Sequence, residues 1–138
     1  MRSRSFVLDA SVTLAWAFDD EKSTVADRAE ALLKSGAALA IVPELWWYEV
    51  RNILLVGERR KRITAAGSAL FLDQLAMINV EIDSSRAEHP MLELARRHLL
   101  TVYDAAYLGL AMRRRVALAT QDVKLARAGL AEGVEILK

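Results

Sequence analysis

Short apolar segments of strand character alternate with longer helical patterns along this chain. The strand-like segments are residues 6–8, 39–42, 79–83, 117–120 and 134–137. Helical spacing or capping signals mark residues 23–35, 44–60, 64–77, 104–115 and 122–128, and a further helix, whose start the residues do not define, ends near residue 98. Parallel strands need crossover connections of about this length. The alternation therefore predicts an α/β fold in which a short parallel sheet lies between layers of helices.

The composition indicates one folded domain over residues 1–138. Hydrophobic residues make up 54% of the chain and only two residues are proline, which disfavours disorder. No apolar stretch approaches the roughly 20 residues of a membrane span. Asp9 interrupts the apolar run after the basic N-terminus, which disfavours a signal peptide. The absence of cysteine excludes disulfides and thiolate metal sites, and it is compatible with the cytoplasmic location that we expect.

Four acidic residues lie within or directly beside apolar segments: Asp9, Glu49, Asp104 and Asp122. Asp9 ends the first strand and Asp122 closely follows the fourth, whereas Asp104 opens a helix and Glu49 lies in the helix after the second strand. Taken singly, Asp104 and Asp122 are explained as helix caps and Glu49 as part of a polar helix face. Ligands of open α/β sheets bind beyond the carboxyl ends of the strands, so all four have one plausible meeting point.

Carboxylates that meet without cationic partners repel one another, and a divalent metal ion removes that repulsion. All-oxygen ligation favours Mg²⁺ or Mn²⁺. Zinc is disfavoured because cysteine is absent and because His89 and His98 do not form a zinc-binding pattern. One or two such ions could activate a water and hold the oxygens of a phosphodiester during its hydrolysis.

Two basic clusters stand out from a net charge of only +1. They consist of Arg59, Arg60, Lys61 and Arg62, and of Arg113, Arg114 and Arg115. Both clusters end expected helices, where cations complement the helix dipole. Alternatively, the arginines hold the phosphates of a nucleic-acid backbone at the rim of the acidic site.

Four sequence blocks resemble those of PIN domains. They are residues 6–11 (FVLDAS), 49–54 (EVRNIL), 103–111 (YDAAYLGLA) and 120–125 (TQDVKL). The blocks occur in order and at the expected spacing, so the resemblance extends over essentially the whole chain. The compact length is similar to that of the VapC-type toxins of bacterial toxin–antitoxin pairs. The resemblance implies a PIN-like three-layer domain and a Mg²⁺- or Mn²⁺-dependent ribonuclease that cleaves RNA and is held silent by an antitoxin protein.

The resemblance also implies roles for individual residues. The four acids match the metal-binding and catalytic positions of the family. Ser11 and Thr120 match hydroxyl positions that support the site, and Asn52 matches a polar position near it. Gln121 stands where the family usually has a small residue.

The aromatic cluster Trp46, Trp47 and Tyr48 precedes Glu49 and is bulkier than the resemblance leads us to expect. Three consecutive residues of a helix cannot all face one core, so at least one should reach the surface. We assign Trp47 to the inward face of its helix. An exposed aromatic would suit a homodimer mate, an antitoxin helix or a stacked base, although packing at the edge of the core explains the cluster equally well.

Three other readings share this architecture. A receiver-like signalling domain would need an acidic pair after the first strand and a lysine after the fifth, whereas Asp19 and Asp20 follow a helical stretch. An aspartate-nucleophile phosphatase would need a second aspartate where Ser11 stands. A catalytically silent RNA- or protein-binding module on the same fold is disfavoured by the complete set of four acids.

Overall fold

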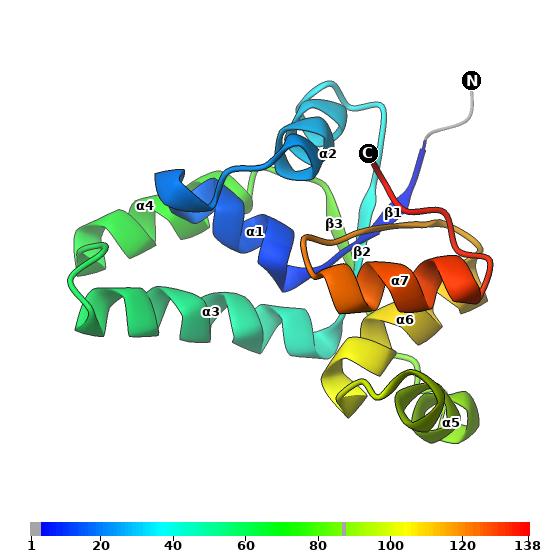
Figure 1. Cartoon of the computed structure of the whole chain (residues 1–138). Helices are drawn as coiled ribbons and strands as arrows, with labels where there is room; N and C mark the ends of the chain where they lie inside the picture. Colours follow the sequence, from blue (N-terminus) through cyan, green and yellow to red (C-terminus); the bar gives the residue numbers. More distant parts are fainter. Residues whose placement is uncertain (1–3, 87) are drawn as a thin grey trace.

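The computed structural model describes residues 4–86 and 88–138, and Figure 1 shows the order of the elements. The elements are β1 (Phe6–Leu8), α1 (Ala10–Ala17), a short 3₁₀ helix η1 (Asp19–Glu21), α2 (Thr24–Lys34), β2 (Ala40–Pro43), α3 (Glu44–Arg59), α4 (Ala65–Leu75), β3 (Val80–Asp83), α5 (Glu88–His98), α6 (Val102–Arg114), β4 (Ala117–Ala119) and α7 (Val123–Ala131). The expected alternation of strands and helices is confirmed.

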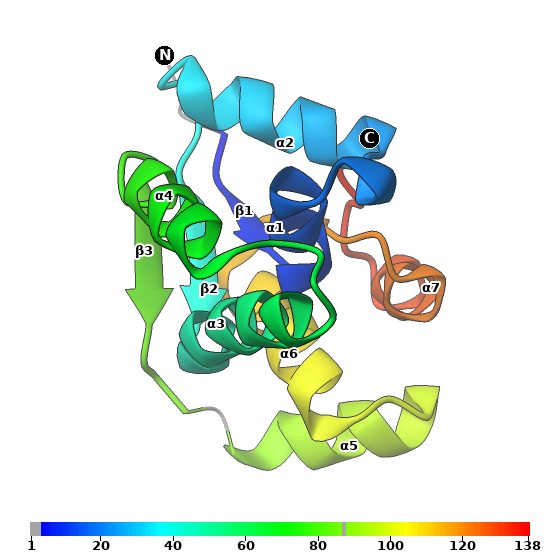
Figure 2. The ribbon, with the colours of Figure 1, turned by 90° about the vertical axis from the view of Figure 1, so that its left-hand side faces the viewer.

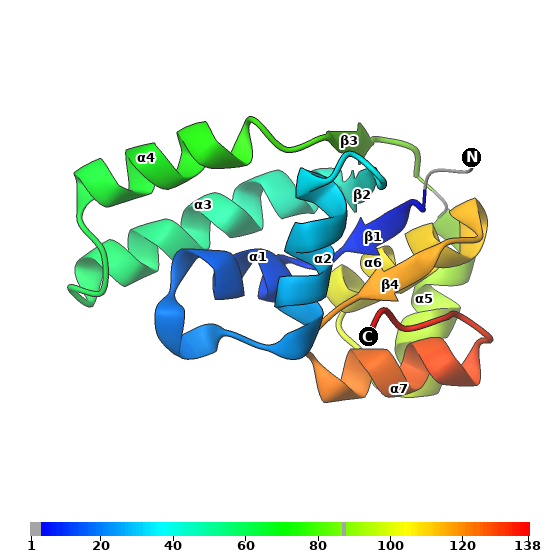
Figure 3. The ribbon, with the colours of Figure 1, turned by 90° about the horizontal axis from the view of Figure 1, so that it is seen from above.

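Among the described residues, four strands form one parallel sheet in the order β3-β2-β1-β4. Figure 2 shows β3, β2 and β1 side by side with their arrows pointing the same way. Seen from above, α2 lies in front of the sheet and α5 and α6 lie behind it (Figure 3). The helices α3 and α4 form a hairpin that extends away from the sheet (Figures 1 and 3). The α/β fold with helices on both faces is therefore confirmed.

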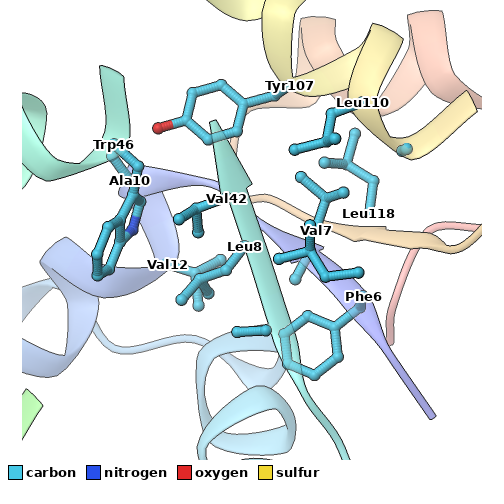
Figure 4. Packing of buried hydrophobic residues seen from close by; sticks show 14 of the residues in the cluster. Phe6, Val7, Leu8, Ala10, Val12, Val42, Trp46, Tyr107, Leu110 and Leu118 are labelled. Carbon is cyan, nitrogen blue, oxygen red and sulfur yellow. The ribbon is translucent and has the colours of Figure 1, made fainter. Parts of the chain in front are cut away.

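The register of the strands explains how the core divides between the two faces. Val7 is aligned with Leu118, whereas Phe6 and Leu8 are aligned with the small residues of β4. Because side chains alternate along a strand, Val7 and Leu118 face the same layer. Figure 4 shows them with Leu110 on the side of α6, and Phe6 and Leu8 on the opposite side. Both faces of β1 are thus buried, as its continuous apolar sequence predicts.

Side-chain caps begin several helices. Ser23 caps α2 and Thr64 caps α4, and the sequence places Thr64 correctly. The start of α6 differs from expectation, because Thr101 accepts the Asp104 N–H at 3.1 Å and is the N-cap. Asp104 therefore lies in the first turn rather than at the cap, and its carboxylate is not used to cap the helix.

Two other segments differ from expectation. Residues 134–137 do not form a regular strand, since only one parallel bridge joins Ile136 to Leu118. The last helix, α7, continues to Ala131, beyond the expected end at residue 128. The helix with the undefined start is α5, which has Pro90 in its first turn. Among the helices that the structure describes, none combines the length and apolar character needed to cross a bilayer.

Candidate active site

Four helices begin at the carboxyl edge of the sheet, and each carries one of the four acids near its start. Asp9 directly precedes α1 and Asp122 caps α7. Asp104 lies in the first turn of α6, and Glu49 lies in the second turn of α3. The parallel strands bring these helix starts together because α1, α3 and α7 each follow a strand directly.

Asp9 is the most deeply placed of the four, with 6% of its surface exposed. Its Oδ2 atom accepts hydrogen bonds from Ser11 Oγ at 2.6 Å and from Thr120 Oγ1 at 2.7 Å. Burial raises the pKa of the Asp9 carboxyl, the two hydroxyls oppose that rise, and the negative charge of Asp122 adds to it. The supporting positions assigned to Ser11 and Thr120 by resemblance thus coincide with direct contacts to Asp9.

Backbone donors determine which way the two hydroxyls point. The Gln121 N–H donates to Ser11 Oγ at 2.9 Å, and the Asp122 N–H donates to Thr120 Oγ1 at 3.1 Å. A backbone N–H can only donate, so each hydroxyl accepts there and directs its own proton to Asp9 Oδ2. This arrangement favours an ionised Asp9 with one carboxylate oxygen oriented by two donors.

Glu49 is held by Tyr107, a residue for which the sequence suggested no role. The phenol of Tyr107 donates to Glu49 Oε1 at 2.6 Å, and its hydroxyl points away from α6 (Figure 4). Burial raises the pKa of Glu49, the Tyr107 hydroxyl opposes this, and the charges of Asp9 and Asp104 raise it further. Burial and the Glu49 charge also raise the pKa of Tyr107, so the phenol stays protonated and remains a donor. The one available signal was a phenol on a buried helical face, three residues after Asp104.

Asp104 and Asp122 are the other two acids at the carboxyl edge of the sheet. Burial and the charges of Asp122 and Asp9 raise the pKa of Asp104, while Thr101 and Lys124 oppose the rise. Asp122 Oδ1 accepts the backbone N–H groups of Lys124 and Leu125 at 2.9 and 3.2 Å. The cap explanation is therefore correct for Asp122, although a cap occupies only one of its two oxygens.

The donor set suits a hard divalent cation. Among the described residues, none of the ion pairs involves any of the four carboxylates. Carboxylate and hydroxyl oxygens are the ligands that Mg²⁺ and Mn²⁺ prefer. Within the same residues, however, no three acidic or histidine side chains are arranged to hold a metal ion. The four acids therefore suit a cation by their ligand type and their uncompensated negative charge, but they do not form a preformed coordination shell.

Comparison with known proteins identifies the family of this chain. The family model for the PIN domain matches residues 6–130. The chain belongs to the PIN domain family. PIN domains are generally nucleases. The fold is also similar to the crystal structure of PAE2754 from Pyrobaculum aerophilum, with a TM-score of 0.71 and 22% sequence identity over 91% of this chain and 85% of that one. A search among curated proteins found no match.

In this PIN domain, the first basic cluster lies at the tip of the α3–α4 hairpin. Arg59 and Arg60 are exposed, and neither takes part in an ion pair within the described residues. Arg62 differs, since it pairs with Asp20 at 2.6 Å and its guanidinium lies 4.2 Å from the centre of the Phe18 ring. Arg62 therefore ties the hairpin to η1.

The second basic cluster is mostly engaged with the end of β3. Arg114 donates to Glu81 at 2.7 Å and to Asp83 at 2.9 Å, and Arg113 donates to Ser85 Oγ at 3.2 Å. Arg115 is exposed and ends α6 with a left-handed backbone conformation (φ 55°). These contacts favour the structural explanation for Arg113 and Arg114, and leave Arg115 for other contacts.

The three aromatic residues do not all face the core, as expected for consecutive positions of a helix. The buried residue, however, is Trp46 and not Trp47. Trp46 is buried, and its indole N–H donates to Thr13 Oγ1 at 3.0 Å. Trp47 and Tyr48 are 42% and 69% exposed, and the Arg51 guanidinium lies 3.6 Å from the Trp47 ring centre. Asn52 is exposed on α3, and no hydrogen bond of the described residues includes its side chain. A supporting role for Asn52 stays a prediction.

Proposed function

We propose that this PIN domain is a Mg²⁺- or Mn²⁺-dependent endoribonuclease that acts as the toxin of a type II toxin–antitoxin pair. The observation that carries the ribonuclease part is the acidic edge of the sheet. There, the buried carboxylate of Asp9 is oriented by two hydroxyls, and the negative charges of the four acids interact strongly enough to raise pKa values within the group. A protein surface seldom gathers uncompensated carboxylates unless a cation joins them.

In the proposed reaction, Asp9, Glu49, Asp104 and Asp122 hold the metal ion. When bound, the ion supplies a more acidic water and neutralises charge on the scissile phosphodiester. Ser11 and Thr120 keep Asp9 ionised and fixed in direction. Tyr107 holds Glu49 through Oε1, which leaves the second oxygen, Oε2, to contact the ion.

RNA is the proposed substrate, and the exposed arginines are its proposed backbone contacts. Arg59 and Arg60 lie about ten residues beyond Glu49 on α3, a distance of roughly 15 Å along the helix. RNA that passes through the acidic edge and follows α3 would reach this end of the hairpin. Arg115 is the corresponding candidate on α6. Arg62, Arg113 and Arg114 would have to give up their ion pairs to contribute.

The antitoxin and homodimer parts of the proposal rest on exposed apolar surface. Trp47 lines a groove between α3, α4 and β3 together with Leu72, Ile78 and Ile82. The ring of Tyr48 packs edge-on against Trp47 with 5.1 Å between the ring centres. Such a surface suits an apolar segment of an antitoxin or of a second copy. Co-purification with the product of the adjacent upstream gene tests the first, and sedimentation of the free protein at micromolar concentration tests the second.

The central experiment measures cleavage of end-labelled single-stranded RNA in Mg²⁺, in Mn²⁺ and in EDTA. We expect cleavage only with metal, and loss of cleavage in Asp104→Asn. Asp27→Asn is the matched control, because Asp27 lies in the first turn of α2, which is also capped by a hydroxyl residue. The control should cleave like the wild type. Cleavage in EDTA would refute metal dependence, and RNA binding without cleavage in any metal would support the silent binding module instead.

A further inference from the structure

The connection between β4 and α7 is joined to the start of α1 by one glutamine. Gln121 makes two hydrogen bonds to Ser11: its backbone N–H donates to the hydroxyl at 2.9 Å, and its side-chain Nε2 donates to the backbone carbonyl at 3.1 Å. Ser11 in turn donates to Asp9, and the residues on either side of Gln121 are Thr120 and Asp122. Gln121 therefore lies where the segments that carry Asp9 and Asp122 meet.

The orientation of the Gln121 amide is determined by its partner. The Ser11 carbonyl can only accept, so the amide nitrogen must face it; the reverse orientation would place two acceptors together. The other end of the amide, Oε1, is buried and has no hydrogen-bond partner among the residues that the structure describes. A buried unsatisfied oxygen costs free energy. Packing alone does not account for glutamine at this position, since methionine fills a similar volume without an unsatisfied oxygen.

We propose that Gln121 is a positioning residue for the acidic site. Its side chain holds Ser11 against the β4–α7 connection, so that Ser11 keeps its proton directed at Asp9 and the segments bearing Asp9 and Asp122 stay at a constant separation. This inference rests on the proposed function, because a fixed separation matters only if both carboxylates hold one cation. Residues that orient metal ligands typically change metal affinity or activity about 10- to 100-fold when replaced.

The variant that tests this role is Gln121→Met, which keeps the side-chain length and removes both the bond to Ser11 and the unsatisfied oxygen. Gln74→Met is the matched control, because Gln74 is exposed on α4. Three quantities are measured on the full chain: Mn²⁺ affinity by electron paramagnetic resonance without RNA, the melting temperature in EDTA, and kcat and KM for RNA cleavage. We expect Gln121→Met to lower Mn²⁺ affinity at least about tenfold. We also expect a lower kcat, an unchanged KM for RNA, and a melting temperature in EDTA that is unchanged or higher.

The outcomes separate the inference from the proposed function. If wild-type protein does not bind Mn²⁺, the proposed function fails and the inference fails with it. If the wild type binds and Gln121→Met binds equally well, the inference alone is wrong. A parallel fall of Mn²⁺ affinity and of the melting temperature in EDTA would assign Gln121 to packing and also overturn the inference. Lower affinity at an unchanged or higher melting temperature supports it.

Discussion

Removal of one hydroxyl group tests whether Glu49 is held in place as the structure indicates. Tyr107→Phe deletes the phenol oxygen that donates to Glu49 Oε1 at 2.6 Å. The ring is 1% exposed, so phenylalanine keeps the packing and the main change is the lost hydrogen bond. Hydrogen bonds to charged groups contribute about 1.5–3 kcal/mol. Glu49 is only partly buried, so water can replace part of the bond and the lower end applies. We expect Tyr107→Phe to lower the free energy of unfolding by about 1.5 kcal/mol, which corresponds to a fall of roughly 5 °C in melting temperature.

A double-mutant cycle isolates this bond from other effects of the substitution. Denaturant unfolding is measured in EDTA for the wild type, Tyr107→Phe, Glu49→Met and the double variant, because methionine removes the acceptor whereas glutamine would still accept the phenol proton. Part of the cost of Glu49→Met should be offset, because burial and the neighbouring acids already raise the pKa of Glu49 and disfavour its charge. The expected coupling between the two positions is about 1 kcal/mol. Tyr103→Phe is the control: Tyr103 lies one turn earlier on α6 and is 65% exposed, so its loss should not change stability.

The result that would refute this reasoning is a coupling energy within about 0.3 kcal/mol of zero, which is the usual additivity of independent sites. In that case water would satisfy Glu49 as well as the phenol does. Tyr107 would then serve only to pack α6 against the sheet, and no positioning of Glu49 could be attributed to it.

Three further predictions concern charge. Burial raises the pKa of Asp9, so ionisation of this carboxyl destabilises the metal-free fold as pH rises from about 4 through the raised pKa. In EDTA, Asp9→Asn should therefore melt at a higher temperature than the wild type at pH 7.5, and the two melting temperatures should converge near pH 4. His98 and Arg97 hold the pKa of Glu132 below its usual value, so the stability lost in Glu132→Gln should be largest at neutral pH and shrink as pH falls below about 4. Replacing Arg59 with Gln should lower the salt slope of RNA binding by about 0.7, and an unchanged slope with a lower melting temperature would make this arginine structural.

Sequence patterns located most elements because local signals agree with the tertiary fold. The apolar run at residues 6–8 and the hydroxyl of Thr64 mark a strand and a helix cap regardless of their neighbours. For α1 (Ala10–Ala17) the sequence indicates only a helical stretch before Asp19 without defined ends, since its residues are mostly apolar and show no polar face. Residues 134–137 have strand character, yet the segment pairs only through Leu118, which gives one bridge instead of a ladder.

The candidate site was only partly accessible from sequence. The four acids stand out because each is next to an apolar run, and the parallel topology explains why they share an edge. Their partners do not stand out. Tyr107 reaches Glu49 across 58 positions of sequence, and Gln121 reaches Ser11 across 110. Such bonds depend on the angle between packed helices, which residue spacing does not encode. The same limit applies to Trp46, whose indole N–H donates to Thr13 on α1, 33 positions earlier in the sequence.

The site's electrostatics connect the stability of the fold with its proposed chemistry. Asp9 is buried at the cost of desolvation, and two hydroxyls offset only part of that cost, because the pKa of its carboxyl remains raised. Burial also raises the pKa values of Glu49 and Asp104, and the negative charges of neighbouring acids raise both further. A cation bound among these carboxylates would remove their mutual repulsion. The relief of that repulsion would then contribute favourably to the free energy of metal binding. At a free metal concentration 100 times the dissociation constant, the linkage stabilises the fold by about 2.7 kcal/mol. The repulsion that destabilises the metal-free protein is therefore the same interaction that would favour binding of the proposed divalent ion.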